Sequence, residues 1–220
     1  MLTLDLTETT FATTAEVESG PRRFLHVGCG PLRKHQTTRG FNTEAWAELR
    51  LDIDEKVEPD IIGTMTDMSA VADASVDAIF SSHNIEHLYA HEVPVALAEW
   101  LRVLKPDGFV VVTCPDLQSV AKLIAEDKLT EPAYQTPSGP VAPLDILYGY
   151  RLALAMGNHY MAHHCGFTLK VLSQTLHANG FASVAAARRE APYFDLWALA
   201  SKKSLEGADL WALARRHFPS

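Results

Sequence analysis

The chain has 220 residues, of which 47% are hydrophobic and 21% charged, and its formal net charge is −8. This length fits one domain, or one domain with an elaborated loop, and the apolar fraction excludes an intrinsically disordered chain. The acidic charge argues against a general nucleic-acid or anionic-membrane binder. Composition therefore indicates a soluble globular protein and leaves its chemistry open.

The N-terminus and the cysteines indicate the compartment. Residues 1–20 form a predicted leader that lacks the basic region and apolar run of a secretory signal. No apolar stretch approaches the roughly 20 residues that a transmembrane helix needs. The three cysteines are widely spaced and form no CxxC pair, which is typical of free thiols in a reducing compartment. We therefore expect a cytoplasmic protein without a membrane partner.

The apolar pattern alternates between strands and helices along the chain. Strands are predicted at residues 23–27, 49–53, 60–63, 76–80, 108–114, 181–187 and 194–201. Helices are predicted at residues 43–49, 92–104, 119–125, 169–178 and 204–217. This alternation predicts an α/β fold, a doubly wound, mostly parallel seven-stranded sheet with helices on both faces. The short connection between the last two strands predicts an antiparallel hairpin at the C-terminal edge.

The segment 127–166 interrupts this rhythm inside what we expect to be a single domain, residues 21–220. It contains four prolines, many aromatic residues and a cluster of His159, His163, His164 and Cys165. Loops of this length are uncommon in compact domains and often serve as lids, so we expect an inserted lid or substrate segment here. His159 and His163 have a spacing that would suit zinc on a helix. No carboxylate stands among the four residues, and we predict no metal site.

A glycine loop, Gly28-Cys29-Gly30, follows the first predicted strand directly. Two glycines at this place let the backbone approach a ligand closely. As a dinucleotide fingerprint the loop is incomplete, because Arg33 stands at the third glycine and Pro31 lacks an N–H donor. By itself the glycine pair fits an ordinary tight turn equally well.

An acid at the end of the next confident strand strengthens the case for a ligand site. Asp52 lies 22 residues after Gly30 (52 − 30), the separation at which a carboxylate can accept the hydroxyl protons of a ribose. Asp54 is a nearby alternative for the same role.

Two longer motifs follow, and with the glycine loop and the acid they indicate a family. Residues 77–88 read Asp-Ala-Ile-Phe-Ser-Ser-His-Asn-Ile-Glu-His-Leu, and residues 99–108 read Glu-Trp-Leu-Arg-Val-Leu-Lys-Pro-Asp-Gly. The chain thereby resembles the class I S-adenosylmethionine-dependent methyltransferases, in particular a small bacterial branch of the methyltransferase-11 type. The resemblance is strong over residues 22–116 and continues weakly to the closing hairpin. It implies a Rossmann-like fold, S-adenosylmethionine as cofactor and methyl transfer as activity.

The resemblance also implies which residues would hold the cofactor. The loop 28–30 would line its methionine portion, and Asp52 would hold the ribose hydroxyls. Ser82 and His83, at the end of the fourth strand, would flank the sulfonium. S-adenosylmethionine has no pyrophosphate, which explains why the loop can dispense with a third glycine.

The adenine end leaves two alternatives. Thr64 stands where the family has the first acid of its run, so either Asp67 with Met68 or Thr64 with Met65 would meet the base. The implied cofactor-binding set is Gly28, Cys29, Gly30, Asp52, Ile53, Met65, Asp67, Met68, Ser82 and His83.

Methyl transfer from a sulfonium mainly needs the acceptor aligned behind the methyl group and shielded from water. A general base helps when the acceptor carries a proton, and histidine titrates near neutral pH. The candidate catalytic residues are His83, His163 and His164. We interpret the neighbouring Glu86 and His87 as a first-turn helix acid and a packed histidine.

The acidic charge favours a small-molecule acceptor over nucleic acid. The stretch Ser82-His83-Asn84 stands where methyltransferases that act on amino groups of DNA bases or glutamine have the motif N-P-P-Y. Its absence argues against those two acceptors. Because no motif-specific catalytic residue stands there, a cofactor-binding protein without transferase activity is a second hypothesis. A nicotinamide-dependent oxidoreductase is a third, which the loop chemistry disfavours. The patterns specify no oligomeric state.

Overall fold

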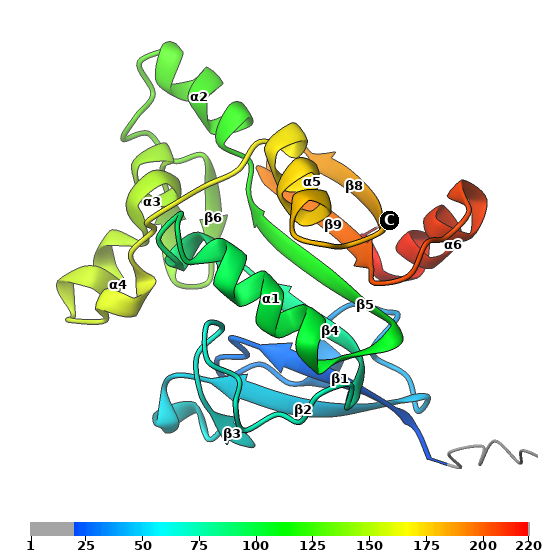
Figure 1. The fold of residues 1–220 in the computed structure, drawn as a ribbon. Coiled ribbons are helices and arrows are strands. Elements are labelled where there is room, and N and C mark those ends of the chain that lie inside the picture. Colours follow the sequence, from blue (N-terminus) through cyan, green and yellow to red (C-terminus); the bar gives the residue numbers. More distant parts are fainter. Residues whose placement is uncertain (1–19, 220) are drawn as a thin grey trace, which may run out of the picture.

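The computed structural model describes residues 20–219, whose centre is a seven-stranded sheet with the order β3-β2-β1-β4-β5-β9-β8 (Figure 1). The strands of this sheet are β1 (Arg22–Val27), β2 (Trp46–Asp52), β3 (Ile61–Ile62), β4 (Val76–Ser82), β5 (Leu104–Pro115), β8 (Ser183–Arg189) and β9 (Asp195–Ser201). The first five strands of the sheet order pair in parallel, and β9 pairs antiparallel with both β5 and β8. The predicted fold class is confirmed.

The strand order determines where a ligand can bind. β1 lies between β2 and β4, and its last four residues, 24–27, are buried. In open parallel sheets ligands bind at the carboxyl ends of the strands, where the connections to the two sides diverge. The ends of β1, β2 and β4 meet at this edge, so the glycine loop, Asp52 and Ser82 are neighbours.

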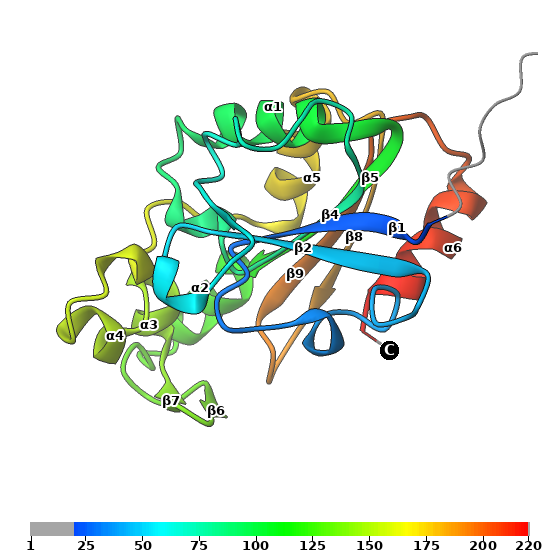
Figure 2. The same ribbon diagram turned by 90° about the horizontal axis from the view of Figure 1, so that it is seen from below.

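Helices cover both faces of the sheet (Figure 2). α1 (Val93–Val103) and α5 (Leu169–Ala178) pack on one face around a large apolar core with the buried Trp100 at its centre. On the other face α6 (Gly207–His217) packs with Phe41 and Trp46 onto a second, smaller core. Both cores form because the strands alternate apolar side chains between the two faces.

The predicted helix at 43–49 is wrong, because β2 already begins at Trp46. Trp46 pairs in register with Arg22 of β1, and its ring packs edge-on against Phe41 at 5.1 Å. The local residues Glu44, Ala45, Ala47 and Glu48 suit a helix. Burial of the tryptophan and the ladder to β1 outweigh this weak local preference.

The segment 127–166 is ordered and has its own elements, which apolar periodicity did not reveal. It contains the hairpin β6 (Tyr134–Thr136) and β7 (Gly139–Val141), α3 (Pro143–Tyr148), α4 (Arg151–Ala155) and the 3-10 turn η4 (His159–Met161). Val141 and Ile146 pack with Val120 of α2 (Leu117–Ala125) and with Phe194 into a third cluster. The segment lies beyond the carboxyl ends of the central strands (Figure 1). Its role as a lid stays a prediction.

Two further expectations concern the ends and the surroundings of the chain. The predicted leader, residues 1–20, lies outside the described residues apart from Gly20. Among the described helices, none has the length and apolar character required to cross a membrane.

Candidate functional site

The glycine loop after β1 has the backbone that only glycine adopts readily. Gly28 and Gly30 have φ of +62° and +50°, which L side chains rarely adopt. A Cβ on Gly28 would lie 2.1 Å from Oδ1 of Asn84, whereas a Cβ on Gly30 would meet nothing within 4 Å. Gly28 is thus required by packing, and Gly30 leaves open space at the sheet edge.

Asp52 ties the end of β2 to this loop. Its Oδ2 accepts the N–H of Gly30 at 2.7 Å, and its Oδ1 accepts the N–H of Asp54 at 2.9 Å. Each carboxylate oxygen can accept more than one hydrogen bond, so lone pairs remain for ligand hydroxyls. Asp54 instead caps the 3-10 turn η2 (Glu55–Val57) by accepting the N–H of Lys56. The two acids considered for the ribose therefore have distinct places.

Cys29 contributes backbone rather than thiol chemistry. Its N–H donates to the carbonyl of Leu51 at 3.2 Å, and its side chain is buried. Burial, with Asp52 nearby, raises the pKa of the Cys29 thiol to about 12. The thiol is therefore neutral at physiological pH, as the main-chain role requires.

Arg50 supports the whole edge, and sequence reasoning missed it. Its side chain is buried in the middle of β2, and its guanidinium donates to the carbonyls of Gly30 (2.5 Å) and Leu32 (3.1 Å). It also donates to the carbonyls of Val57 and Glu58 at 3.1 and 2.6 Å. The signal in the sequence was an arginine between two leucines inside a predicted strand, because arginine is rarely buried without partners.

The residues considered for adenine separate in the structure. Met68 is buried in the core, and its N–H donates to Oε2 of Glu99 at 2.8 Å, so this amide is already bonded within the protein. Asp67 is exposed, and Met65 is half-buried. Ile53, directly after Asp52, exposes 42% of its surface. Ile53, Met65 and Asp67 are accordingly the side chains that remain accessible to a base.

The end of β4 lies beside the glycine loop. The Asn84 side chain donates to the carbonyls of Val27 and Ser82 at 3.1 and 2.8 Å. Ser82 shares a hydroxyl–hydroxyl hydrogen bond of 2.9 Å with Thr113 of β5. His83 has φ of +54°, and its side chain is 48% exposed. The strained backbone at His83 turns the chain toward the sheet edge, where such strain often accompanies function.

Glu86 is a first-turn acid, as expected, but of a 3-10 turn, and its side chain is buried. It lies in the 3-10 turn η3 (Ile85–His87) and is buried, with the Nδ1 of His83 3.3 Å from its Oε1. Burial of Glu86 opposes its charge, but the contact with His83 outweighs this effect. The pKa of Glu86 is lowered by His83, with His87 and His163 adding, and the pKa of His83 is raised by Glu86. One atom each of Glu86, His87 and His163 lie within 4.8 Å of one another.

The three candidate catalytic histidines divide into two groups. His83 and His163 both lie close enough to Glu86 to lower the pKa of its carboxyl group. Burial lowers the pKa of His163 itself. His164 is exposed and stacks on Tyr89 with 4.2 Å between ring centroids. The helical arrangement considered for His159 and His163 is wrong, because the 3-10 turn η4 ends at Met161 and His163 follows it. The backbone is extended from Ala162, and the N–H groups of His164 and Cys165 donate to the carbonyl of Glu86 in η3.

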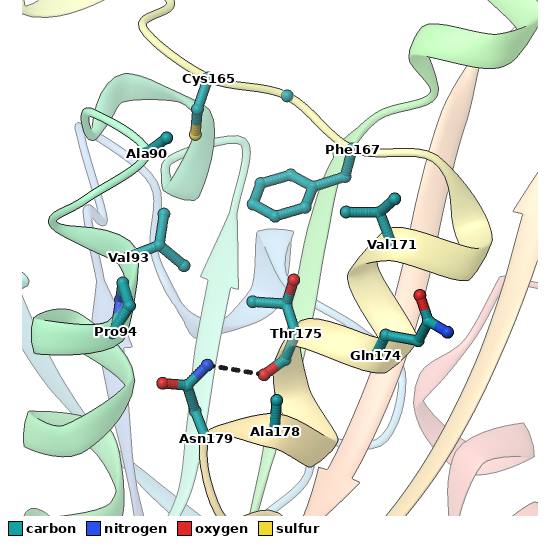
Figure 3. A pocket seen from close by; sticks show the side chains of 11 residues that line it. Ala90, Val93, Pro94, Cys165, Phe167, Val171, Gln174, Thr175, Ala178 and Asn179 are labelled. Atoms are coloured by element: carbon teal, nitrogen blue, oxygen red, sulfur yellow. Dashed lines mark hydrogen bonds between the residues drawn. The ribbon is translucent and has the colours of Figure 1, made fainter.

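A groove of about 460 Å³ lies elsewhere, between α1 and α5 (Figure 3). Its walls include Val93 and Pro94 of α1 and Val171 and Thr175 of α5, with Phe167 between them. The groove lies on a face of the sheet and not among the loops of β1 and β2. It is therefore not part of the candidate site.

Comparison with known proteins identifies the fold family. Residues 25–112 match the family model described as a methyltransferase domain. This span runs from β1 to β5 and includes the glycine loop, Asp52 and Ser82. Residues 25–112 resemble a methyltransferase domain. The resemblance recognised in the sequence is confirmed, whereas a comparison with curated protein sequences found no match.

Solved structures extend the likeness in fold over most of the chain. A possible histamine N-methyltransferase from Thermotoga maritima has 14% identity and a TM-score of 0.53, with 82% of each chain covered. The 1,6-didemethyltoxoflavin-N1-methyltransferase of Burkholderia thailandensis, solved with 1,6-didemethyltoxoflavin and S-adenosylhomocysteine, has 15% identity and a TM-score of 0.53 over 84% and 72% of the chains. A SAM-dependent methyltransferase from Archaeoglobus fulgidus has 16% identity and a TM-score of 0.52 over 83% and 87%. At these identities the likeness establishes the fold.

Proposed function

We propose that the protein is an S-adenosylmethionine-dependent methyltransferase that acts on a small-molecule acceptor. The observation that carries the proposal is the bond between Asp52 and Gly30, which joins an acid-ended β2 to an open glycine loop. The family match covers both residues. A methyltransferase of similar fold was solved with 1,6-didemethyltoxoflavin and S-adenosylhomocysteine, which supports the acceptor class.

The cofactor would lie across the carboxyl ends of β1 and β2. The loop 28–30 would meet its methionine portion, and Asp52 would accept the ribose hydroxyls with its remaining lone pairs. Ile53, Met65 and Asp67 would surround the adenine. Arg50 donates a hydrogen bond to the carbonyl of Gly30, which would orient the loop before the cofactor binds.

The local structure after β1 supports this cofactor over a nicotinamide dinucleotide. Dinucleotide binding places the pyrophosphate on the N-terminus of a helix that follows the first strand. The described chain has only the 3-10 turn η1 (Lys34–Gln36) between β1 and β2. A sulfonium cofactor needs no such anion site.

The transfer end would lie at Ser82 and His83. A methyl group on sulfonium needs an acceptor held in line behind it and shielded from water. His83 and His163 stay our candidates for contact with the acceptor, and we drop His164 because it stacks on Tyr89. The segment 127–166, which packs against Phe194 next to β9, would cover the acceptor.

Calorimetry tests the cofactor proposal. We expect S-adenosylmethionine and S-adenosylhomocysteine to bind and NAD not to bind. The substitution Asp52→Ala should weaken S-adenosylmethionine about tenfold or more, because a hydrogen bond to a charged group contributes about 1.5–3 kcal/mol. The matched control is Asp54→Ala, which removes an acid two residues away that faces η2.

The outcomes separate the three hypotheses. Binding of NAD in place of S-adenosylmethionine would contradict the proposal, and equal affinity in the Asp52 and Asp54 variants would remove Asp52 from the ribose. A protein that binds the cofactor but transfers no labelled methyl group to any compound in a broad acceptor screen would be a binding protein without transferase activity.

A further inference from the structure

A cluster of electron-rich side chains lies beside the transfer edge, and the proposed cofactor site does not use it. It consists of Glu86 and His87 from η3 and His163 from the stretch that follows η4. Each residue contributes one potential ligand atom, and these atoms lie within 4.8 Å of one another. Residues 77 positions apart in the sequence thus converge on one point.

The buried Glu86 carboxylate has one long contact to a cationic group and can take further partners. Its side chain is 1% exposed, and neither carboxylate oxygen accepts a hydrogen bond among the described residues. The nearest cationic group is the Nδ1 of His83 at 3.3 Å from Oε1, on a side chain that is 48% exposed. An ionised carboxylate removed from water is strongly unfavourable unless it is paired or coordinates a metal. The carboxylate can therefore accept a second cationic partner beside His83.

Both imidazoles are hydrogen-bonded through Nδ1 to backbone carbonyls. His87 Nδ1 lies 3.0 Å from the carbonyl of Ala162, and His163 Nδ1 lies 2.8 Å from the carbonyl of Ile146. A carbonyl only accepts, so each Nδ1 carries the proton and each Nε2 keeps its lone pair. Metal-binding histidines almost always donate their other ring N–H to a carboxylate, a backbone carbonyl or a water in this way.

We propose that Glu86, His87 and His163 bind a divalent transition-metal ion, with Zn²⁺ as the representative. Two imidazole nitrogens and one carboxylate suit Zn²⁺, Fe²⁺ or Co²⁺, whereas Mg²⁺ and Ca²⁺ prefer sites made of oxygen alone. Three protein ligands leave at least one coordination position for an exogenous oxygen, as in catalytic zinc sites. The sequence analysis predicted no metal because it considered His163 with His159, whereas the carboxylate comes from a distant segment.

The position of the ion gives it a role that rests on the proposed function. Glu86 lies four residues after Ser82, and the backbone carbonyl of Glu86 accepts the N–H groups of His164 and Cys165. The site therefore joins the end of β4 to the C-terminal end of the segment 127–166. A metal-bound hydroxyl would lose its proton to solvent more readily, so the acceptor class would be an oxygen nucleophile such as an alcohol or a phenol. Its oxygen would form a bond to the methyl carbon as the bond from that carbon to sulfur breaks, and S-adenosylhomocysteine would leave.

Metal binding is measured directly on the full chain after removal of metals with a chelator. We expect titration calorimetry to show one Zn²⁺ per chain, and Co²⁺ to give the visible absorption typical of mixed nitrogen and oxygen ligands. His87→Gln and His163→Gln should each weaken Zn²⁺ about 100-fold, because each removes a nitrogen ligand. The matched control is His164→Gln, which changes the exposed neighbour of His163 and should leave affinity within about twofold.

The two ligand variants lie in different segments, so a folding defect in one leaves the other to decide. Circular dichroism and thermal unfolding of the metal-free variants identify such a defect. Absence of Zn²⁺ binding by the wild-type chain would overturn the proposal, as would an equal loss in the His164 control. Binding of S-adenosylmethionine to the metal-free protein is measured in parallel, so failure of the metal site and failure of the cofactor proposal are distinguished.

Discussion

Arg50 shows how one buried residue can organise a ligand-binding edge. The guanidinium is a planar fork with five donors, and here it spans two loops that belong to different connections of the sheet. Its partners are backbone carbonyls of Gly30 and Leu32 on one side and of Val57 and Glu58 on the other. Gly30 also donates its N–H to Asp52, so the glycine loop is held through both the N–H and the carbonyl of Gly30.

Replacement of Arg50 by Lys tests this role. Lysine keeps the charge but cannot reach both loops from a single ammonium, and the carbonyls that lose their donor remain buried. We expect the free energy of unfolding to fall by about 2–4 kcal/mol, and S-adenosylmethionine affinity to fall with it. Urea unfolding and calorimetry measure the two effects. Arg33→Lys is the control, because Arg33 is exposed; an equally small effect at both positions would contradict the role of Arg50.

Single residues of the site differ in how far the sequence could predict them. Gly28, Gly30 and Asp52 could be proposed from the sequence, because the glycines follow one strand and the acid ends the next at a characteristic spacing. Their contact with a cofactor stays a prediction. Arg50 and the partners of Glu86 were not, because a buried charge reveals its purpose only when the distant carbonyls or imidazoles that meet it are known. Met68 fits a family motif, but its side chain packs in the apolar core and its N–H donates to Glu99.

At the scale of elements, long periodic segments were predictable and short ones were not. α1 and α5 begin and end within a residue of their predicted bounds, because eleven and ten residues carry a full apolar stripe. β6 and β7 have three residues each, which is too few to show a period. These short elements are stabilised by the third apolar cluster, which packs the segment 127–166 against α2 and Phe194.

The third cluster predicts a local unfolding unit. Ile146 is 4% exposed, so Ile146→Ala removes buried methyl groups at a cost of about 2–4 kcal/mol. We expect hydrogen exchange in residues 134–150 to accelerate, whereas β4 and β5 stay protected. Leu152→Ala, at a position 56% exposed in the same segment, should change neither region. Equal loss of protection in β4 and β5 would mean that the segment unfolds only together with the sheet.

At the scale of the whole molecule, α6 near the C-terminus packs against the loop 38–41, which lies between β1 and β2. His217, in its last turn, is buried against Phe41 and Phe109, with ring centroids 4.3 and 5.2 Å apart. Its Nδ1 lies 3.1 Å from the hydroxyl of Thr38. A Cβ on Gly40 would approach the His217 ring to 2.6 Å, so the loop 38–41 and α6 are closely fitted. The second core therefore depends on an uncharged imidazole.

This dependence makes stability sensitive to acid. Burial, assisted by Arg22 and Arg216, lowers the pKa of His217 from 6.5 to about 4. Because the unfolded chain binds this proton first, the stabilisation is complete above pH 6.5 and declines as the pH falls toward 4. The decline between pH 7.5 and pH 5 amounts to about 2 kcal/mol from this residue. A favourable interaction of protonated histidine with the helix C-terminus would act in the opposite direction, but it is weaker than the burial term.

Urea unfolding of the wild type and of His217→Gln at pH 7.5 and pH 5 measures the contribution. Glutamine can still pair with Thr38 but does not titrate, so the variant should lose about 2 kcal/mol less than the wild type between the two pH values. His35→Gln, at an exposed position, should retain the full pH dependence. Identical pH dependence in the wild type and His217→Gln would contradict the prediction. It would show that the packing of α6 on the loop 38–41 accommodates a charged imidazole.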